Sequence, residues 1–415
     1  DGDPGHIEGE GFSPYVDGLI FDGDANYRTM FQAISSHGSF DEWQKTAREC
    51  RNMSVTARIM LSAAFASVLI QPLGLLPFFV HLWGVDSGTG KTVALMLAAS
   101  VWGDPQIGRY IQTFNSTMVG QEKMAAFLNS IPFLIDELQL ARDGRGKSQF
   151  NVYALAQGVG RTRGNKSGGV DRTPTWGNCI LTTGESPLTN LSDGAGAVNR
   201  VIDIECRADE KVIEDGMRIS AALKKHYGFA GRTFVKILSQ EQHMAEVAKM
   251  YHGVFRLLSE SDTTEKQAMA AAAIVTADVF SSLWIFQDEN FLTVPQIAEF
   301  LQSKAAVSAG ERGYRYMCDW VAQNSTRLQP DVENGDTYGL IEGDWAYIIY
   351  SVFRKATEDA GFSSAALLSH MKQKGLIQTR QKNNTRGKRI NGVLTECVVM
   401  RIAPLEEEEP DFQNL

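Results

Sequence analysis

The chain has 415 residues and a formal net charge of −9, with 43% hydrophobic and 21% charged residues. This length predicts several domains, and the ordinary hydrophobic content indicates a soluble globular protein. The negative charge excludes a surface that is basic throughout, as in proteins that coat DNA, but it allows local basic patches. The five cysteines form no C-x-x-C pair. This argues against a disulfide framework or a zinc site and fits the reducing cytoplasm, where we expect the protein to act.

Residues 1–71 predict an extended N-terminal segment followed by helices. The chain begins at Asp1 rather than at a methionine and has no visible signal peptide, so we expect it to be a fragment or a processed chain of a longer protein. Ser39 and Glu42 form a capping-box pattern at the start of one helix. The apolar run 59–84 is long enough to suggest a membrane span, but Gln, Pro and Gly interrupt it. We therefore predict a buried helix over roughly 55–71, a strand over 78–83 and no membrane partner.

Residues 72–207 alternate between short apolar strands and helices, which predicts a mostly parallel sheet with covered faces. Strands are expected at 78–83, near 109–114, and at 131–136, 177–185 and 199–206. Helices are expected at 91–101, around 119–129 and near 149–158, and a polar, glycine-rich insert covers 158–175.

The remaining chain predicts three further parts. Residues 208–330 are mainly helical and are expected to form a lid or connector. Residues 335–403 contain helices followed by two strands around a basic tip, which is typical of a winged helix. Residues 404–415 form an acidic tail that we expect to be disordered.

The stretch WGVDSGTGKT, residues 83–92, lies between a predicted strand and a predicted helix. Backbone amides of a glycine-rich loop at a helix start bind phosphate oxygens, and the helix dipole favours their charge. Lys91 would reach the β- and γ-phosphates, and the Thr92 hydroxyl would bind Mg²⁺. Val85 stands where the usual pattern has its first glycine, and Gly84 comes one place early. The predicted residues for binding ATP are Asp86, Ser87, Gly88, Thr89, Gly90, Lys91, Thr92 and Val93.

Acidic and polar residues follow two of the later strands. The stretch FLIDE ends in Asp136, a candidate Mg²⁺ ligand, and Glu137, a candidate general base for the attacking water. Thr183, at the end of the strand CILTTGE, would orient that water, because ligands favour this edge of a parallel sheet. A strand threonine without such a role is almost equally consistent with the pattern.

Arg200 precedes the last apolar strand of this region. In an ATPase that forms rings, an arginine here can reach the γ-phosphate bound to the neighbouring subunit and stabilise transition-state charge. A simple surface charge is the alternative.

Two segments carry concentrated positive charge and are candidate DNA contacts. The insert 158–175 is predicted to form a hairpin, although a solvated loop fits the pattern equally well. The predicted winged helix carries basic residues with no acid between 361 and 395, and a winged helix for protein contacts is the alternative. The candidate DNA-binding residues are Arg161, Arg163, Lys166, Arg172, Lys382, Arg386, Lys388 and Arg389.

From about Gly38 to Leu238 the sequence resembles the domain of unknown function 927 family, helicase-like ATPases of phages and mobile elements. The resemblance rests on FDEWQKTARE, HLWGVDSGTGKTVALMLAASVWGDP, FLIDEL, YALAQGVGRTRG, ILTTGE and FAGRTFVKIL. The combination is specific, whereas the glycine loop alone is not. Val85 departs from the pattern and puts only the start of the loop in question.

In its core this family is similar to superfamily III and MCM-like helicases of the AAA+ class. The resemblance implies an α/β P-loop AAA+ core with helical N-terminal and lid regions and a C-terminal winged helix. It also implies a homo-hexameric ring that hydrolyses ATP at subunit interfaces and threads single-stranded DNA through its channel. By position, Thr183 matches the polar sensor and Arg200 the arginine finger, and the insert matches a hairpin that contacts DNA near Lys166.

We therefore expect an ATP-dependent DNA helicase or translocase of a phage or mobile element, with a replicative role. Two alternatives remain open. A DNA-binding initiator that uses ATP only to assemble would show little turnover, which the candidate base Glu137 disfavours. An AAA+ ATPase that remodels proteins would be indifferent to DNA, which the two basic segments disfavour.

Overall fold

The computed structural model describes residues 6–7, 11–12, 27–113, 117–137, 152–162, 173–189, 195–330, 336–380 and 383–402. The chain divides into two compact units. Unit 1 comprises Asp1–Thr189 and Gly196–Ser303, and unit 2 comprises Lys304–Leu415 together with Asn190–Ala195. The C-terminal unit therefore begins about thirty residues before the expected start at 335. The reason is that the helix Ala309–Gln323 buries Met317 and Val321 in the core of unit 2.

From Arg28 onward the N-terminal part of unit 1 is helical and packs into one hydrophobic core with the sheet. The Ser39 hydroxyl caps the second helix by accepting a hydrogen bond from the Glu42 amide at 3.4 Å. The third helix is buried on nearly all sides, and a short 3-10 turn ends it before the expected position 71. The elements are β1 (His6–Ile7), β2 (Gly11–Phe12), α1 (Arg28–Ala33), α2 (Phe40–Met53), α3 (Val55–Ala66) and η2 (Ser67–Leu69).

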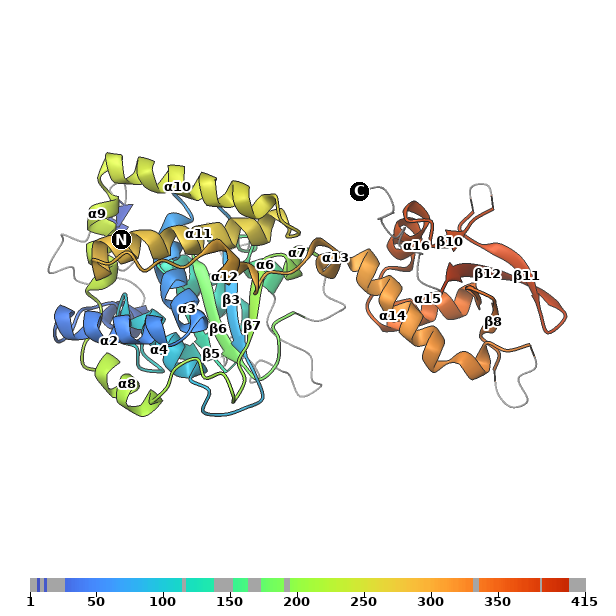
Figure 1. Cartoon of the computed structure of the whole chain (residues 1–415), viewed down its shortest axis with the longest axis horizontal. Helices are drawn as coiled ribbons and strands as arrows, with labels where there is room; N and C mark the ends of the chain where they lie inside the picture. The colour runs from blue at the N-terminus through green and yellow to red at the C-terminus, as the bar shows by residue number, and fades with distance from the viewer. Residues whose placement is uncertain are drawn as a thin grey trace, which may run out of the picture. The chain divides into compact units, whose positions relative to one another are not determined.

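The core of unit 1 is a five-stranded parallel sheet, as the sequence predicts, and the order of its strands is β4-β5-β6-β3-β7 (Figure 1). The first strand of the core, β3, therefore lies between β6 and β7. Trp83 at its end pairs with Gly184 and with Glu205, so the carboxyl ends meet at one edge. In chain order the elements are β3 (Phe78–Trp83), α4 (Lys91–Ser100), β4 (Gln112–Thr113), α5 (Met118–Leu128), β5 (Phe133–Asp136), α6 (Val152–Leu155), β6 (Cys179–Gly184), α7 (Ala195–Val198) and β7 (Val201–Glu205).

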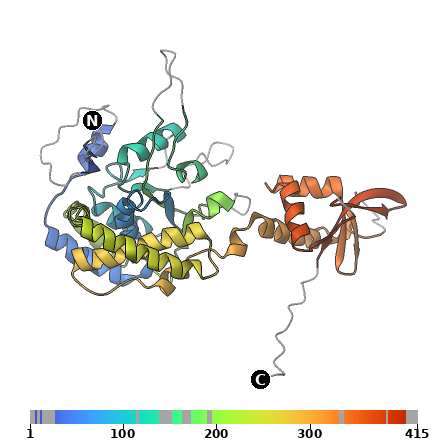
Figure 2. The same cartoon turned by 90° about the horizontal axis from the view of Figure 1, so that it is seen from above.

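Helices after the sheet complete unit 1, and α11 packs on both α3 and α10 (Figures 1 and 2). The helical stretches that were expected as separate N-terminal and lid regions thus share one core with the sheet up to Ser303. The helical stretch Glu265–Phe286 is long and apolar enough to cross a membrane. However, 78% of its apolar 18-residue segment is buried inside the protein. The elements are α8 (Gly216–Leu223), α9 (Ala230–Leu238), α10 (Glu241–Ser259), α11 (Glu265–Ser281), the π-helix η4 (Ser282–Phe286) and α12 (Val294–Ala298).

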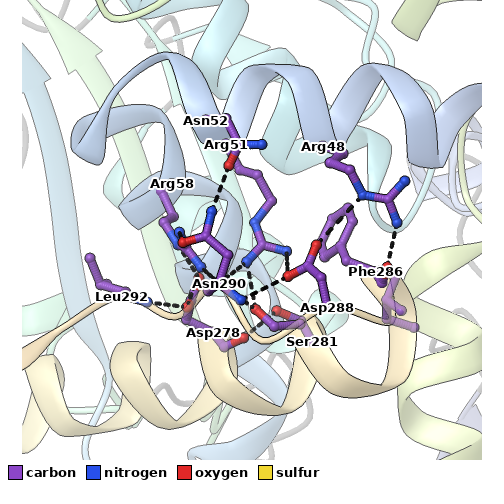
Figure 3. A network of polar contacts seen from close by, with 12 residues as sticks. Arg48, Arg51, Asn52, Arg58, Asp278, Ser281, Phe286, Asp288, Asn290 and Leu292 are labelled. Carbon is purple, nitrogen blue, oxygen red and sulfur yellow. Dashed lines mark hydrogen bonds and ion pairs between the residues drawn. The ribbon is translucent and has the colours of Figure 1, made fainter.

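A buried polar network joins α2 and α3 to the end of α11 (Figure 3). The Asp278 carboxylate accepts two hydrogen bonds from the Arg58 guanidinium, at 2.8 and 3.0 Å, and one from Ser62 at 2.8 Å. Arg51 donates to the Ser282 hydroxyl at 2.5 Å and lies 4.4 Å from the centre of the Phe286 ring. Burial lowers the pKa of Arg51, and the charge of Arg58 lowers it further. The network therefore holds two buried guanidinium groups that need their acidic partners.

Unit 2 has its own core and a sheet of order β10-β12-β9-β8, with β11 paired to β12. Asn391 and Gly392, with φ of +48° and +82°, form the tight turn between β11 and β12. Together with the helices this gives the expected winged-helix arrangement. The elements are α13 (Lys304–Val307), α14 (Ala309–Gln323), η5 (Ser325–Arg327), β8 (Gly339–Glu342), β9 (Trp345–Ile349), α15 (Tyr350–Asp359), α16 (Ser364–Gln373), β10 (Ile377–Gln378), β11 (Arg386–Ile390) and β12 (Val393–Arg401).

The network predicts a large stability loss for Asp278→Ala. The substitution leaves the guanidinium of Arg58 buried without its carboxylate, which costs about 3–5 kcal/mol of unfolding free energy. Glu49→Ala on α2 is the matched control, because both side chains of its ion pair with Arg218 are exposed. Its loss should cost about 1 kcal/mol or less. Urea denaturation measures both, and equal midpoints for the two variants would contradict the assignment.

Candidate nucleotide-binding site

The loop between β3 and α4 requires glycine at two positions for steric reasons. At Gly90, where φ is +91°, an added Cβ would lie 2.6 Å from the amide nitrogen of Ile213. At Gly84 it would lie 2.2 Å from the carbonyl oxygen of Cys206. Val85, by contrast, is 84% exposed. The close approach that demands a glycine therefore falls at Gly84, which explains why this loop carries its first glycine one position early.

Lys91 spans the loop from the first turn of α4. Its ammonium group donates to the carbonyl oxygens of Gly84 at 3.0 Å and Asp86 at 2.8 Å, and to the Thr89 hydroxyl at 3.2 Å. The Asp86 carboxylate in turn accepts a hydrogen bond from the Ala208 amide at 3.2 Å. The positive charge of Lys91 is thus held over the loop whose backbone is expected to bind phosphate.

Asp136, only 3% exposed, lies at the centre of the polar end of the site. Its Oδ1 accepts hydrogen bonds from the Thr92 hydroxyl at 3.3 Å, the Glu137 amide at 3.2 Å and the Thr183 hydroxyl. Pairing of Ile135 with Thr182 places Asp136 beside Thr183 on the neighbouring strand. A carboxylate next to a threonine hydroxyl at a helix start is a donor set that suits Mg²⁺, a cation that prefers oxygen ligands. The residues therefore fit the predicted metal.

Glu137 has an unusual backbone, with φ of +61°. This left-handed conformation is costly for a residue with a side chain and is found preferentially at functional sites. It is stabilised by the Glu137 amide, which donates to Asp136 and, at 3.3 Å, to the Thr183 hydroxyl. The chain turns out of β5 at this point, and the exposed Glu137 lines the cleft above the glycine loop.

These residues line one cleft of about 630 Å³, a volume typical of small-ligand sites. The cleft contains every predicted nucleotide and catalytic residue except Arg200. No sequence pattern marks one wall of the cleft, the segment 211–217, whose Val212 amide donates to the Thr89 carbonyl at 2.8 Å. None marks Gly184 and Glu185 either. Besides Gly84 and Val85, the additional lining residues are Gly184, Glu185, Lys211, Ile213, Asp215, Gly216 and Met217.

Two side chains, the buried His81 and the half-buried Asp203, hold the segment that follows Thr183. The His81 ring contacts the Thr182 hydroxyl at 2.7 Å and the Ser186 carbonyl at 3.0 Å. Burial lowers the pKa of His81, which favours a neutral ring. Asp203 on β7 accepts hydrogen bonds from the Leu188 amide at 3.0 Å and the Thr189 hydroxyl at 2.9 Å. The end of β6 is thereby fixed relative to β3 and β7.

Arg200 does not lie in this cleft. Its carbonyl accepts a hydrogen bond from the Phe79 amide at 2.8 Å, at the start of β3, so it lies at the opposite edge of the sheet from the glycine loop. The residue is 7% exposed, and its guanidinium lies 5.1 Å from the centre of the Tyr153 ring. Within the described residues, its Nε and one terminal nitrogen are buried without a hydrogen-bond partner. A role toward the nucleotide of a neighbouring subunit stays a prediction.

The base of the predicted hairpin is present in unit 1. Val159 and Thr175 form an antiparallel bridge, and the Gly160 amide donates to the Pro174 carbonyl at 2.8 Å. Arg161 is exposed next to this stem. The other predicted DNA contacts of the insert lie outside the described residues; they are Arg163, Lys166 and Arg172.

The wing of unit 2, residues 386–401, exposes two of the predicted basic residues, Arg386 and Arg389. Lys388 instead forms an ion pair with Glu342 at 2.6 Å and lies 4.5 Å from the centre of the Tyr347 ring. Its charge is thus partly neutralised within the fold. Lys382 lies outside the described residues.

Comparison with known proteins gives two family matches. Residues 17–176 match the domain of unknown function DUF927, and residues 308–403 match the Cch helix turn helix domain. The solved structure of an SCCmec type IV Cch, described as an active helicase, is similar with a TM-score of 0.70 and 20% identity. The match covers 94% of this chain and 74% of that one, and at this identity it shows a shared fold. No curated protein matches the chain.

The loop geometry predicts that only one of two neighbouring substitutions lowers the stability of the protein. Gly84→Ala places a methyl group against the Cys206 carbonyl, so the loop must shift, at a cost of about 1–3 kcal/mol in unfolding free energy. Val85→Ala removes only exposed atoms and should change stability by less than about 0.5 kcal/mol. Thermal unfolding of the two variants checks this. A Gly84→Ala protein as stable as the parent would show that the glycine is not needed there.

Proposed function

We propose, from the premise that this chain carries a DUF927 domain joined to a Cch-type helix-turn-helix domain, that it is an ATP-dependent DNA helicase or translocase of a mobile element. One observation carries the proposal: the glycine loop, Asp136, Glu137 and Thr183 line a single cleft at the carboxyl edge of the parallel sheet. The likeness to a solved helicase and the match to a helix-turn-helix domain support DNA as the partner.

In the proposed reaction, water attacks the γ-phosphoryl group of ATP and releases ADP and phosphate. The loop amides and Lys91 bind the phosphates, because the ammonium group bonds more strongly to the negatively charged oxygens of a triphosphate than to neutral loop carbonyls. Thr92 and Asp136 would hold Mg²⁺, which supplies positive charge to the phosphate oxygens. Glu137 accepts the proton of the attacking water, and Thr183, which already contacts Asp136, orients that water.

We propose that the chain assembles into a homo-hexameric ring with single-stranded DNA in its central channel. ATP hydrolysis in this ring would move the DNA, and the protein would act in replication. The position of Arg200 supports a role toward the nucleotide of a neighbouring subunit. Arg200 lies away from its own cleft, and two of its guanidinium nitrogens lack hydrogen-bond partners among the described residues. The hairpin base, where Val159 pairs with Thr175, supports a DNA contact by the insert, because it leads into β6, whose far end carries Thr183. ATP hydrolysis would move the insert between two positions and so pull DNA through the ring.

Two alternatives predict different behaviour. An initiator that binds ATP only to assemble does not need a carboxylate in the position of Glu137. A protein-remodelling ATPase does not need the helix-turn-helix domain. We therefore favour the DNA motor over both.

The base assignment predicts that Glu137→Gln lowers ATP turnover by about 10²–10⁴-fold while nucleotide affinity is kept, because only proton transfer is lost. Phosphate release with and without single-stranded DNA measures this, and DNA should stimulate the parent protein. Glu241→Gln on α10 is the matched control, since this exposed glutamate does not line the cleft. Full turnover by Glu137→Gln would remove Glu137 as the base, and turnover indifferent to DNA would favour protein remodelling.

The wing predicts a salt-dependent contribution to duplex binding. Arg386→Ala combined with Arg389→Ala should reduce the slope of log affinity against log salt by about two, because each lost phosphate contact contributes about one. Lys388→Ala should change the slope less, since its ion pair with Glu342 must first break. Titration of a random-sequence duplex at several salt concentrations checks this. An unchanged slope in the double variant would assign the wing to another partner.

A further inference from the structure

The cleft has a second end that the hydrolysis chemistry does not use. Asp136 and Thr183 come from β5 and β6, which lie on one side of the central strand β3. The segment 206–217 follows β7, which lies on the other side. A triphosphate whose last phosphate meets Glu137 and Thr183 therefore extends across the loop toward residues 211–217. This inference rests on the proposed function, because it takes a bound nucleotide as its premise.

The wall at this end is fixed against the loop and the following helix. The Val212 amide bonds to Thr89, and its carbonyl accepts a hydrogen bond from the Ser54 hydroxyl at 2.8 Å. Gly216 lies against Val93, since a Cβ there would be 3.2 Å from a Val93 methyl group. The wall is thus a preformed part of the cleft.

Met217 lies at this wall and is 88% exposed, although it is a large apolar residue. Its position is set by the turn before it. Asp215 has a φ of +48°, and its carboxylate accepts a hydrogen bond from Arg218 at 2.9 Å. Arg218 also donates to Glu49 on α2 at 3.1 Å. An apolar side chain is therefore held at the open end of a polar phosphate cleft, beside Val93 and Ile213, which also line it.

We propose that Met217, together with Val93 and Ile213, forms the subsite for the purine base of the bound nucleotide. The flexible, polarizable thioether of Met217 packs on one face of the base, as methionine sulfur does on aromatic rings. The phosphates provide most of the affinity, and Met217 makes the cleft prefer a nucleotide over an inorganic polyphosphate.

The test measures separately how the nucleotide base and the phosphates contribute to binding affinity. A fluorescent ADP labelled on the ribose is bound to the full chain with Mg²⁺ and displaced by ADP or by tripolyphosphate. Met217→Ala should weaken ADP about three- to tenfold and leave tripolyphosphate unchanged. Met217→Leu, which restores apolar contact, should recover most of the ADP affinity. Met250→Ala on α10 is the control, because this partly exposed methionine does not line the cleft.

The outcomes distinguish this inference from the function on which it rests. If the parent chain binds neither ADP nor tripolyphosphate, the proposed nucleotide site fails, and the base subsite fails with it. If the parent binds both but Met217→Ala weakens them equally, or weakens neither, the nucleotide site stands and Met217 has no part in base recognition. Selective loss of ADP affinity, recovered by Met217→Leu, would establish the subsite.

Discussion

One buried carboxylate oxygen connects the parts of the site. Oδ1 of Asp136 accepts hydrogen bonds from the helix after the glycine loop, from the next residue of its own chain and from the neighbouring strand. Because low local dielectric strengthens such bonds and makes an unpaired group costly, the three donors and the acid fix one another. The left-handed turn at Glu137 follows from this arrangement, since the Glu137 amide must face Asp136 and Thr183. The exposed carboxylate of Glu137 then takes its place at the cleft.

The position of β3 decides what can surround the nucleotide loop. A strand with neighbours on both sides brings two different walls to the loop that follows it. β5 and β6 bring acids and a hydroxyl, whereas the chain after β7 brings the apolar side chains of Ile213 and Met217 together with Lys211 and Asp215. Of the two walls, only the one after β7 offers apolar side chains. Both contact the loop directly, through Thr92 on one side and through Thr89 and Gly90 on the other.

The sequence predicts those features whose cause is local. The apolar strands, the glycine loop and the two acids that end FLIDE can be predicted from short patterns, because a parallel sheet brings the ends of its strands together. The wall at 211–217 has no such pattern, since its role depends on the Val212 amide meeting a residue more than a hundred positions earlier. The same holds for the glycine at position 84, whose requirement comes from Cys206. Likewise, the sequence alone predicts that Lys388 is a free basic residue, because its partner Glu342 comes from β8, more than forty positions earlier.

Helix α2 links the base end of the cleft to the buried network of Figure 3. Glu49 on α2 bonds Arg218, which holds the turn before Met217, while Arg51, two residues later, bonds Ser282 and the carbonyl of Asn290 at 2.6 Å. Close-packed interiors transmit displacement rather than absorb it. The Glu49 pair is exposed and weak, whereas the arginine network is buried and strong. If the segment 211–217 moves when a nucleotide binds or leaves, the ion pair between Glu49 and Arg218 breaks first. Helix α2 then remains packed against α11.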